Sequence, residues 1–465
     1  MAGACGGTTG RGAWGESPAG RKAATSDARP AGLTATSVLP PSAPGLGVSR
    51  AITILTWLVF AISFLKGLRM PSLWSATHFT FNYSHGFVRR GFVGELLRRI
   101  GGDHAFSYRS LALLSFVLLV AAVVVMALLL RRTLRADPED FGLRVAILAF
   151  AASPSVVFFV HMIGYLDYLG VVAVAFLLLF CARSTSQYAI FYCALPIGIV
   201  LALIHESLPV MFAPVMFFAM LCHIVNRNRE RTLARRANGI MVAHALLFTG
   251  LVLVASGVVG TLGTRPVRVV KSMELSVAEQ ADFPLRPDAL EVLRRSPGHM
   301  ALRVMPSYYG RPGTATQFLK QALVALPGYA FLVYYGLQSV GRLGLSRRMA
   351  LLLRCTFVGA AVSPLSLNLV GWDHGRWNSV AMIATMLCIA ALKVLPPGPA
   401  IAEGQARHQR PSPILLTLGG AAIALGLSAD NVLFDGYTVQ LFPFEKTAAY
   451  FIEAFREGFR IIPEH

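Results

Sequence analysis

Apolar residues dominate the chain from residue 51 onward and fall into runs of similar length. A helix needs about 20 mostly apolar residues to cross a bilayer. Eleven runs approach that length: 51–68, 110–130, 144–160, 165–182, 188–204, 208–225, 239–260, 322–340, 349–367, 378–395 and 413–430. The pattern predicts an all-α polytopic membrane protein with about eleven transmembrane helices.

Residues 188–225 are too long for one span, so the chain must break within them. Pro209 follows the polar pair His205–Glu206, and a proline there favours the end of one helix and the start of another. We therefore expect two spans that meet near residue 206.

The remaining segments complete the predicted domain organisation. Residues 1–48 are rich in Ala, Gly, Ser, Thr and Pro without apolar periodicity, which is typical of a disordered tail. Residues 49–430 form the transmembrane domain with two large external loops, 69–109 and 261–321. In 431–465 an apolar stripe lies opposite charged residues, which predicts an external amphipathic helix that either lies on the outer membrane surface or caps the external loops.

Composition agrees with a bilayer environment. Hydrophobic residues make up 55% of the 465 residues and charged residues only 14%, whereas a soluble chain carries about a quarter charged residues. The net charge of +19 does not indicate nucleic acid as a partner, because the basic residues lie in short clusters between apolar runs. Such clusters indicate contact with membrane lipids.

The basic clusters also set the orientation. Four inter-span segments are rich in basic residues: Arg131, Arg132, Arg135 and Arg144; Arg227, Arg229, Arg231, Arg235 and Arg236; Arg342, Arg347, Arg348 and Arg354; Lys393, Arg407 and Arg410. With eleven spans and a cytoplasmic N-terminus, all four fall on one side, as the positive-inside rule requires. The sequence thus predicts a multi-pass protein of the cytoplasmic (inner) membrane.

Under this topology the unusual polar residues gather on the outer face. We expect candidate catalytic side chains at Glu206, His205, Asp167 and Glu95, and candidate substrate-binding side chains at Arg89, Arg90, Asp373, His374 and Arg376. Charged groups in or beside spans are costly and are usually functional or paired. No grouping with zinc-ligand spacing is present, so neither a metal nor another cofactor is predicted.

Each candidate also has a structural interpretation. The pair His205–Glu206 either closes a helix break by hydrogen bonding or performs acid/base chemistry, for which desolvation would raise the pKa of Glu206 towards neutrality. The i,i+3 spacing of Asp373 and Arg376 also suits an ion pair. Arg89 and Arg90, with Arg98 and Arg99, either contact lipid headgroups or bind a substrate phosphate.

The first external loop contains a candidate interfacial helix. Val88, Phe92, Leu96 and Ile100 recur every four residues, with arginines between them. That spacing suits a helix lying at the membrane surface.

In its layout of many spans, a large external loop and polar residues at the outer face, the chain resembles two groups of bacterial enzymes. These are the GT-C superfamily glycosyltransferases and the O-antigen polymerases or ligases. The resemblance implies a polyprenyl-phosphate-linked sugar as donor. It also implies an acidic base in the first external loop, for which Glu95 or Asp103 is available, and diphosphate contacts by Arg89, Arg90, His205 and Arg376.

Two kinds of function therefore stand open. The first is glycosyl transfer or polymerisation in cell-envelope polysaccharide biosynthesis, with arginines on the phosphate and a carboxylate (Glu206, Asp167 or Glu95) activating the acceptor hydroxyl. The second is a transporter or flippase for a lipid-linked or anionic substrate. A non-catalytic envelope-assembly protein is a further alternative. The oligomeric state is open.

Overall fold

The computed structural model describes residues 46–102, 106–184, 188–228, 234–371, 373–395, 413–428 and 456. These residues belong to one compact unit that begins at Pro44. The predicted N-terminal tail lies almost wholly outside the described residues, as does the predicted C-terminal amphipathic helix apart from Arg456.

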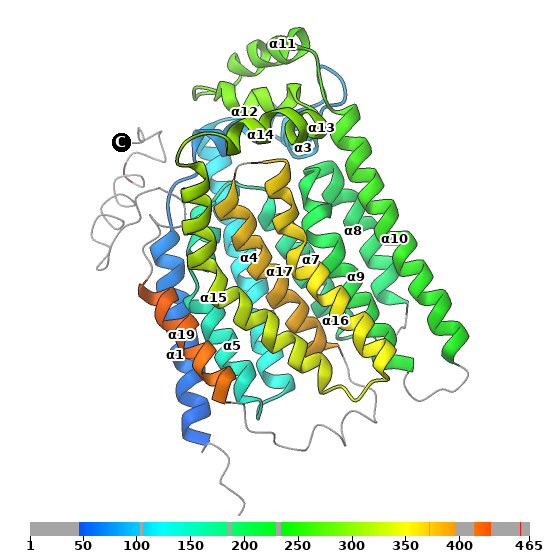
Figure 1. Cartoon of the computed structure of the whole chain (residues 1–465). Helices are drawn as coiled ribbons and strands as arrows, with labels where there is room; N and C mark the ends of the chain where they lie inside the picture. The colour runs from blue at the N-terminus through cyan, green and yellow to red at the C-terminus, as the bar shows by residue number, and fades with distance from the viewer. Residues whose placement is uncertain are drawn as a thin grey trace, which may run out of the picture. The chain divides into compact units, whose positions relative to one another are not determined.

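The described chain is helical throughout (Figure 1). The long helices are α1 (Leu46–Gly67), α4 (Tyr108–Ala136), α5 (Phe141–Ala152), α6 (Pro154–His161), α7 (Asp167–Cys181), α8 (Ala189–Ile204), α9 (Ser207–Asn228), α10 (Ala234–Leu262), α15 (Thr314–Gly341), α16 (Arg347–Val362), α17 (His374–Val394) and α19 (Pro413–Ser428). Each of the eleven predicted apolar runs coincides with one of these helices or, at 144–160, with the pair α5 and α6.

Short helices fill the segments predicted as external loops. They are α2 (Leu73–His78), α3 (Gly91–Gly101), α11 (Val267–Ala278), α12 (Pro287–Glu291), the 3₁₀ turn η2 (Val292–Arg294), α13 (Pro297–His299), the π-turn η3 (Met300–Val304) and α14 (Met305–Tyr309). The 3₁₀ segment η4 (Ser363–Leu369) leads into α17. Figure 1 shows α3 and α11–α14 together beyond one end of the long helices. We call this end the capped end.

Within the described residues, six helices are long and apolar enough to cross a membrane: α1, α4, α9, α10, α16 (extended by η4 to Leu369) and α17. The pair α5 and α6 makes a seventh if it is counted as one span bent by 46°. Helices α7, α8 and α19 are apolar but shorter.

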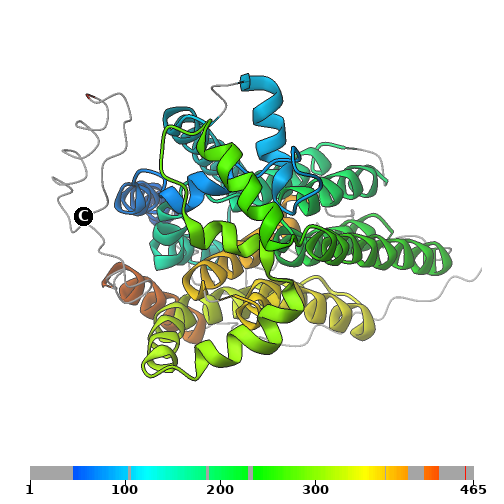
Figure 2. The same ribbon diagram turned by 90° about the horizontal axis from the view of Figure 1, so that it is seen from above.

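Helices α9 and α17 lie in the interior of the bundle. Of their most apolar stretches, 83% and 89% of residues are buried, against 22% in α1 and 28% in α10. Figure 2 shows the bundle from above the capped end. Both central helices begin at the capped end, at Ser207 and His374. Their N-terminal residues are therefore enclosed by protein on several sides.

The break between α8 and α9 lies where the sequence predicted it. Helix α8 ends at Ile204, His205 adopts an extended conformation, and α9 begins at Ser207. Pro209 lies in the first turn of α9, where a proline is tolerated because its missing N–H has no helical partner there.

The predicted interfacial helix is shorter than its apolar spacing suggested. Helix α3 begins at Gly91, so Val88 precedes it and is buried in a separate small core beside α11 and α12. Leu96 and Ile100 are exposed on α3. The exposure of Leu96 and Ile100 thus matches the prediction, whereas Val88 packs inside the protein.

Candidate functional site

The structure brings Arg90 and Glu206 together at the capped end. Arg90 Nη2 donates to Glu206 Oε1 at 2.6 Å, and Arg90 Nε lies 3.1 Å from both carboxylate oxygens. Arg89 Nη1 lies 3.5 Å from the same carboxylate. The side chains of Arg90 and Glu206 are each only 12% exposed. A buried, bidentate pair of this kind is strong and geometrically specific.

The backbone around Arg90 is shaped for this contact. Arg90 has φ 63°, and among the described residues it is the one non-glycine residue with a positive φ. This left-handed conformation is unfavourable for residues with a Cβ and is found where surrounding contacts enforce it. Gly263, just after α10, provides the room: a Cβ there would lie 2.3 Å from the Arg89 backbone nitrogen.

Arg89 points to a different partner from its neighbour. Its Nη2 donates to the carbonyl oxygens of Val292 and Arg295, the latter at 2.6 Å. Arg89 therefore ties the first external segment to the end of η2 while Arg90 holds Glu206.

The pKa of Glu206 is contrary to our expectation from sequence. Burial by itself would raise the pKa of this carboxyl, but the charge of Arg90, with that of Arg89, holds the pKa well below its ordinary value. The expectation of a near-neutral Glu206 is therefore wrong. The sequence indicated that the Glu206 carboxyl would be desolvated. It did not indicate that Arg90 and Arg89, which lie 116 and 117 positions earlier in the chain, would contact it.

His205 adjoins this pair as a neutral imidazole. Its Nδ1 accepts from the Ser207 N–H at 3.1 Å and lies 2.8 Å from the Ser207 hydroxyl. Burial, chiefly, and the charge of Arg90 hold the pKa of His205 well below its usual range. Since Nδ1 accepts, the ring proton resides on Nε2, which is buried and has no partner within the described part of the chain.

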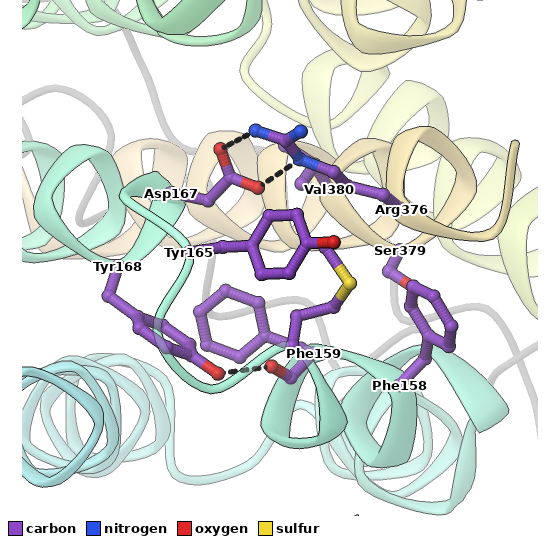
Figure 3. A pocket seen from close by; sticks show the side chains of 9 residues that line it. Phe158, Phe159, Tyr165, Asp167, Tyr168, Arg376, Ser379 and Val380 are labelled. Atoms are coloured by element: carbon purple, nitrogen blue, oxygen red, sulfur yellow. Dashed lines mark hydrogen bonds and ion pairs between the residues drawn. The ribbon is translucent and has the colours of Figure 1, made fainter. Parts of the chain in front are cut away.

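A second ion pair lies at the N-termini of α7 and α17 (Figure 3). Arg376 Nε and Nη2 donate to the two oxygens of Asp167 at 2.6 and 2.8 Å. Both side chains are about 5% exposed. Asp373 is a weaker partner, with its Oδ2 3.7 Å from Arg376 Nη1. The predicted i,i+3 contact thus exists, but the principal partner of Arg376 is Asp167.

Asp373 has an altered acidity. Burial raises the pKa of its carboxyl to about 6; the charge of Asp167 adds to the rise and that of Arg376 opposes it. Its side chain is 28% exposed. Its pKa therefore differs in direction from those of Glu206 and Glu95, which nearby arginines lower.

A chain of aromatic contacts extends from the second ion pair. The Arg376 guanidinium lies over the rings of Tyr165, at 5.0 Å, and Trp377, at 4.5 Å. Tyr165 stacks on Trp74 at 5.1 Å, and Trp74 contacts His78 at 3.8 Å between ring centroids.

His78 lies at the far end of this chain. It is 5% exposed, and its pKa is held well below the usual range by burial, with the charges of Arg90 and Arg376 contributing. No sequence pattern singled out His78, because α2 is too short to show periodicity. We call the set Arg90, Glu206, His205, His78, Asp167 and Arg376 the polar cluster.

A small pocket adjoins the second pair. It is lined by Phe158, Phe159, Met162, Tyr165, Asp167, Tyr168, Arg376, Ser379 and Val380. In Figure 3 the Asp167–Arg376 pair forms one side of the pocket, and the Tyr168 hydroxyl donates to the Phe159 carbonyl at 2.6 Å. The arginine end of the pair is thus set among apolar and aromatic side chains.

Glu95 has its own partners. Its carboxylate accepts from Arg98 at 2.9 Å, from Arg99 at 2.6 Å and from the Tyr83 N–H at 3.2 Å. Hydrogen bonding by Arg98 is the largest of the causes that lower the pKa of Glu95 to about 2. These contacts hold α3 against the preceding loop and do not link Glu95 to the polar cluster. Asp103, the other acid suggested for this role, lies outside the described residues.

His374 lies at the first residue of α17, next to Asp373. Its Nδ1 contacts the Asn368 side-chain oxygen, and its ring lies among Tyr308, Tyr309 and Phe318. Among the residues that the structure describes, no group of three or more His, Cys, Asp or Glu side chains is arranged to hold a metal ion.

Part of the chain matches a family of uncharacterised membrane proteins. The family model described as "Uncharacterised membrane protein Rv1490" matches residues 47–271. That range contains Arg90, Asp167 and Glu206 and ends before Arg376. Together with the apolar helices, the match shows that the chain is a helical membrane protein.

Individual relatives match over a smaller region. The uncharacterized proteins Rv1490 of Mycobacterium tuberculosis (strain ATCC 25618 / H37Rv) and Mb1527 of Mycobacterium bovis (strain ATCC BAA-935 / AF2122/97) are each 31% identical over 167 residues. The match covers 34% of this chain and 37% of each relative. No solved structure matches the chain significantly.

Proposed function

We propose that the protein transfers a glycosyl group from a polyprenyl-phosphate-linked sugar at the outer face of the cytoplasmic membrane. One observation carries the proposal: Arg90, held by Glu206, and Arg376, held by Asp167, come from segments far apart in the chain and lie at the same end of an apolar helix bundle, where both charges act on His78 and His205. Buried guanidinium groups beside neutral imidazoles suit a phosphate that arrives from lipid.

Charge stabilisation would supply much of the catalysis. In glycosyl transfer from such a donor the phosphate leaves with the bonding electrons, so negative charge grows on it in the transition state. Arginines held in a water-poor site stabilise developing charge more than they would in water. Glu206 and Asp167 fix the two guanidinium groups in place before the donor binds.

The proposal includes an eleven-span topology with a cytoplasmic N-terminus. It is supported by the coincidence of the eleven apolar runs with helices and by basic residues at the ends of α4, α15 and α16 that lie away from the capped end, among them Arg131, Arg342 and Arg347. Single cysteines tested with an impermeant thiol reagent in intact cells check this arrangement. Labelling of a cysteine at exposed Arg268 of α11, and protection of one at exposed Arg347 of α16, is the expected result.

Turnover in membranes tests the function itself. Vesicles containing the protein are supplied with radiolabelled polyprenyl-phosphate sugars, and transfer to acceptor lipid or glycan is measured for wild type, Arg376→Gln and Arg268→Gln. Arg268 is exposed on α11 and serves as the matched control. Transfer by wild type and the control, with a loss of about 100-fold or more in Arg376→Gln, supports the proposal. No transfer by wild type contradicts the proposal, and equal transfer by all three removes Arg376 from the mechanism.

Transport of a lipid-linked or anionic substrate is the second candidate. The observation in its favour is the 46° bend between α5 and α6, since interrupted spans are common in transporters. Transporters built from repeats have such breaks in both halves, and the described chain contains one bent pair. Movement of the labelled donor across the vesicle membrane without chemical change would favour this alternative.

A further inference from the structure

The carboxylates expected to act as base are already engaged. Glu206 is bound by Arg90, Asp167 by Arg376, and Glu95 by Arg98 and Arg99. A carboxylate held by arginine is a weak base, because the arginine stabilises its charged form. Glycosyl transfer to a hydroxyl therefore needs another proton acceptor near the polar cluster.

The hydrogen bonds of Asn368 fix the protonation of His374. The Asn368 side-chain nitrogen donates to the Leu365 carbonyl at 2.9 Å, so its side-chain oxygen is the atom facing His374 Nδ1. An amide oxygen only accepts, and His374 Nδ1 must therefore carry the proton. The lone pair of the neutral ring then lies on Nε2, which is buried and has no partner among the residues described.

Aromatic rings hold the imidazole in position. Tyr309 stacks on His374 at 5.6 Å between centroids, and Phe318 meets it edge-on at 5.0 Å. The Tyr309 hydroxyl donates to the Asn368 carbonyl at 2.8 Å. We call Tyr308, Tyr309 and Phe318 the aromatic cage. Asn368, which orients His374, is therefore itself held by a residue of this cage. A side chain oriented by a second, fixed side chain is common in catalytic sites.

We propose that His374 is the general base of the transfer reaction, that Nε2 is its reactive atom, and that Asn368 is its positioning residue. This inference rests on the proposed function. The acceptor hydroxyl gives its proton to His374 Nε2 as its oxygen forms a bond to the anomeric carbon of the donor sugar. The bond from that carbon to the phosphate oxygen breaks, and its electron pair leaves with the polyprenyl phosphate. The proton on Nε2 then passes to water or to the released phosphate.

Asp373 is the nearest competitor for this role. Its carboxylate faces Arg376 at 3.7 Å and its side chain is 28% exposed. His374 has an orienting partner on one nitrogen and, on the other, a lone pair that no residue of the described chain engages. The proposal therefore assigns Asp373 no proton transfer, and Asp373→Asn serves as a comparison in the test.

The test is chemical rescue in the vesicle transfer assay described above. His374→Ala should lose about 100-fold or more in the rate of transfer, in the range typical of general-base removal. Because the aromatic cage leaves a ring-shaped space, added imidazole should restore about a tenth or more of the lost rate. Donor KM should change by less than about threefold. His223→Ala, a buried histidine 17 residues beyond Glu206 on α9, is the matched control and should keep its rate with or without imidazole.

Asn368→Ala provides a second route if His374→Ala fails to fold. It should lower the rate at least about tenfold and alter its pH dependence, whereas a purely structural role would leave the pH profile unchanged. Wild-type transfer with an unaffected or unrescued His374→Ala overturns the assignment and leaves the proposed function standing. Loss of rate in Asp373→Asn that equals the loss in His374→Ala also overturns it. No transfer by wild type with any polyprenyl-linked donor removes the proposed function instead.

Discussion

Arg376 and Asp167, 209 positions apart in the chain, form a bidentate ion pair at the N-termini of α17 and α7. Each partner comes from an apolar helix, and both are almost fully buried. Asp167 also lies in the first turn of α7, where the helix dipole stabilises a negative charge. The pair therefore joins two helices and sets a guanidinium group at the polar cluster.

Substituting one partner of this pair should destabilise the protein more than substituting both. Asp167→Asn leaves a buried arginine without its counter-charge, and we expect a loss of about 3–5 kcal/mol in the free energy of unfolding. The double variant Asp167→Asn with Arg376→Gln should recover part of that loss. Unfolding of the purified protein in detergent measures all three forms. Additive effects of the two substitutions would show that the residues are not coupled.

Glu206→Gln should convert the first pair into an anion site. The substitution keeps the side-chain volume and leaves Arg90 and Arg89 without the carboxylate, so we expect a lower unfolding temperature. Inorganic pyrophosphate should then raise that temperature more in Glu206→Gln than in wild type, because the anion takes the place of the carboxylate. Glu279→Gln, at the exposed end of α11, is the control. A pyrophosphate effect no larger than that of the control argues against anion binding by these arginines.

Gly263→Ala should disturb the turn that presents Arg90. The added Cβ would lie 2.3 Å from the Arg89 nitrogen and 2.8 Å from its Cα, so the backbone of the turn must shift. We expect a loss of stability of roughly 1–3 kcal/mol, as for other overpacked sites. Gly257→Ala, on α10, meets nothing within 4 Å and should be stabilising by about 0.5–1 kcal/mol. Thermal unfolding of both variants measures the difference, and equal behaviour of the two would refute this account of the turn.

Asp373 should make stability depend on pH in a specific window. Burial raises its folded-state pKa to about 6, whereas the carboxyl titrates near 3.9 in an unfolded chain. The stability that this proton contributes is present below pH 3.9 and is lost as pH rises through 6, by at most about 3 kcal/mol. Wild type should therefore lose stability relative to Asp373→Asn between about pH 4 and 6. Parallel stability curves for the two proteins would contradict the assigned pKa.

Much of the helix arrangement follows from the sequence. Apolar runs of about 20 residues can satisfy their backbone groups only as helices within a membrane, and each predicted run is helical. The break at His205–Glu206 followed from the length of 188–225. The convergence of Arg90, Asp167, Glu206 and Arg376 at one end was suggested by the alternation of spans.

The partners within that end could not be predicted. Glu206 contacts Arg90, and Arg376 prefers Asp167 to its i,i+3 neighbour, because helix packing and not chain spacing decides which side chains meet. The pKa of Glu206 depends on those partners, so the direction of its shift was wrongly predicted from the sequence. In the loop 261–321 the helices that follow α11 are only three to five residues long, too short for a periodic signal. The packing of Tyr308 and Tyr309 around His374 is therefore visible only in the folded structure.

A density map of the protein with its donor tests the central claim most directly. The protein is embedded in a lipid nanodisc with a polyprenyl-phosphate-linked sugar and imaged by cryo-electron microscopy. The account predicts phosphate density between Arg90 and Arg376, with phosphate oxygens about 2.7–2.9 Å from a guanidinium nitrogen. Donor density at another surface, with both arginines still bound to Glu206 and Asp167, would contradict it.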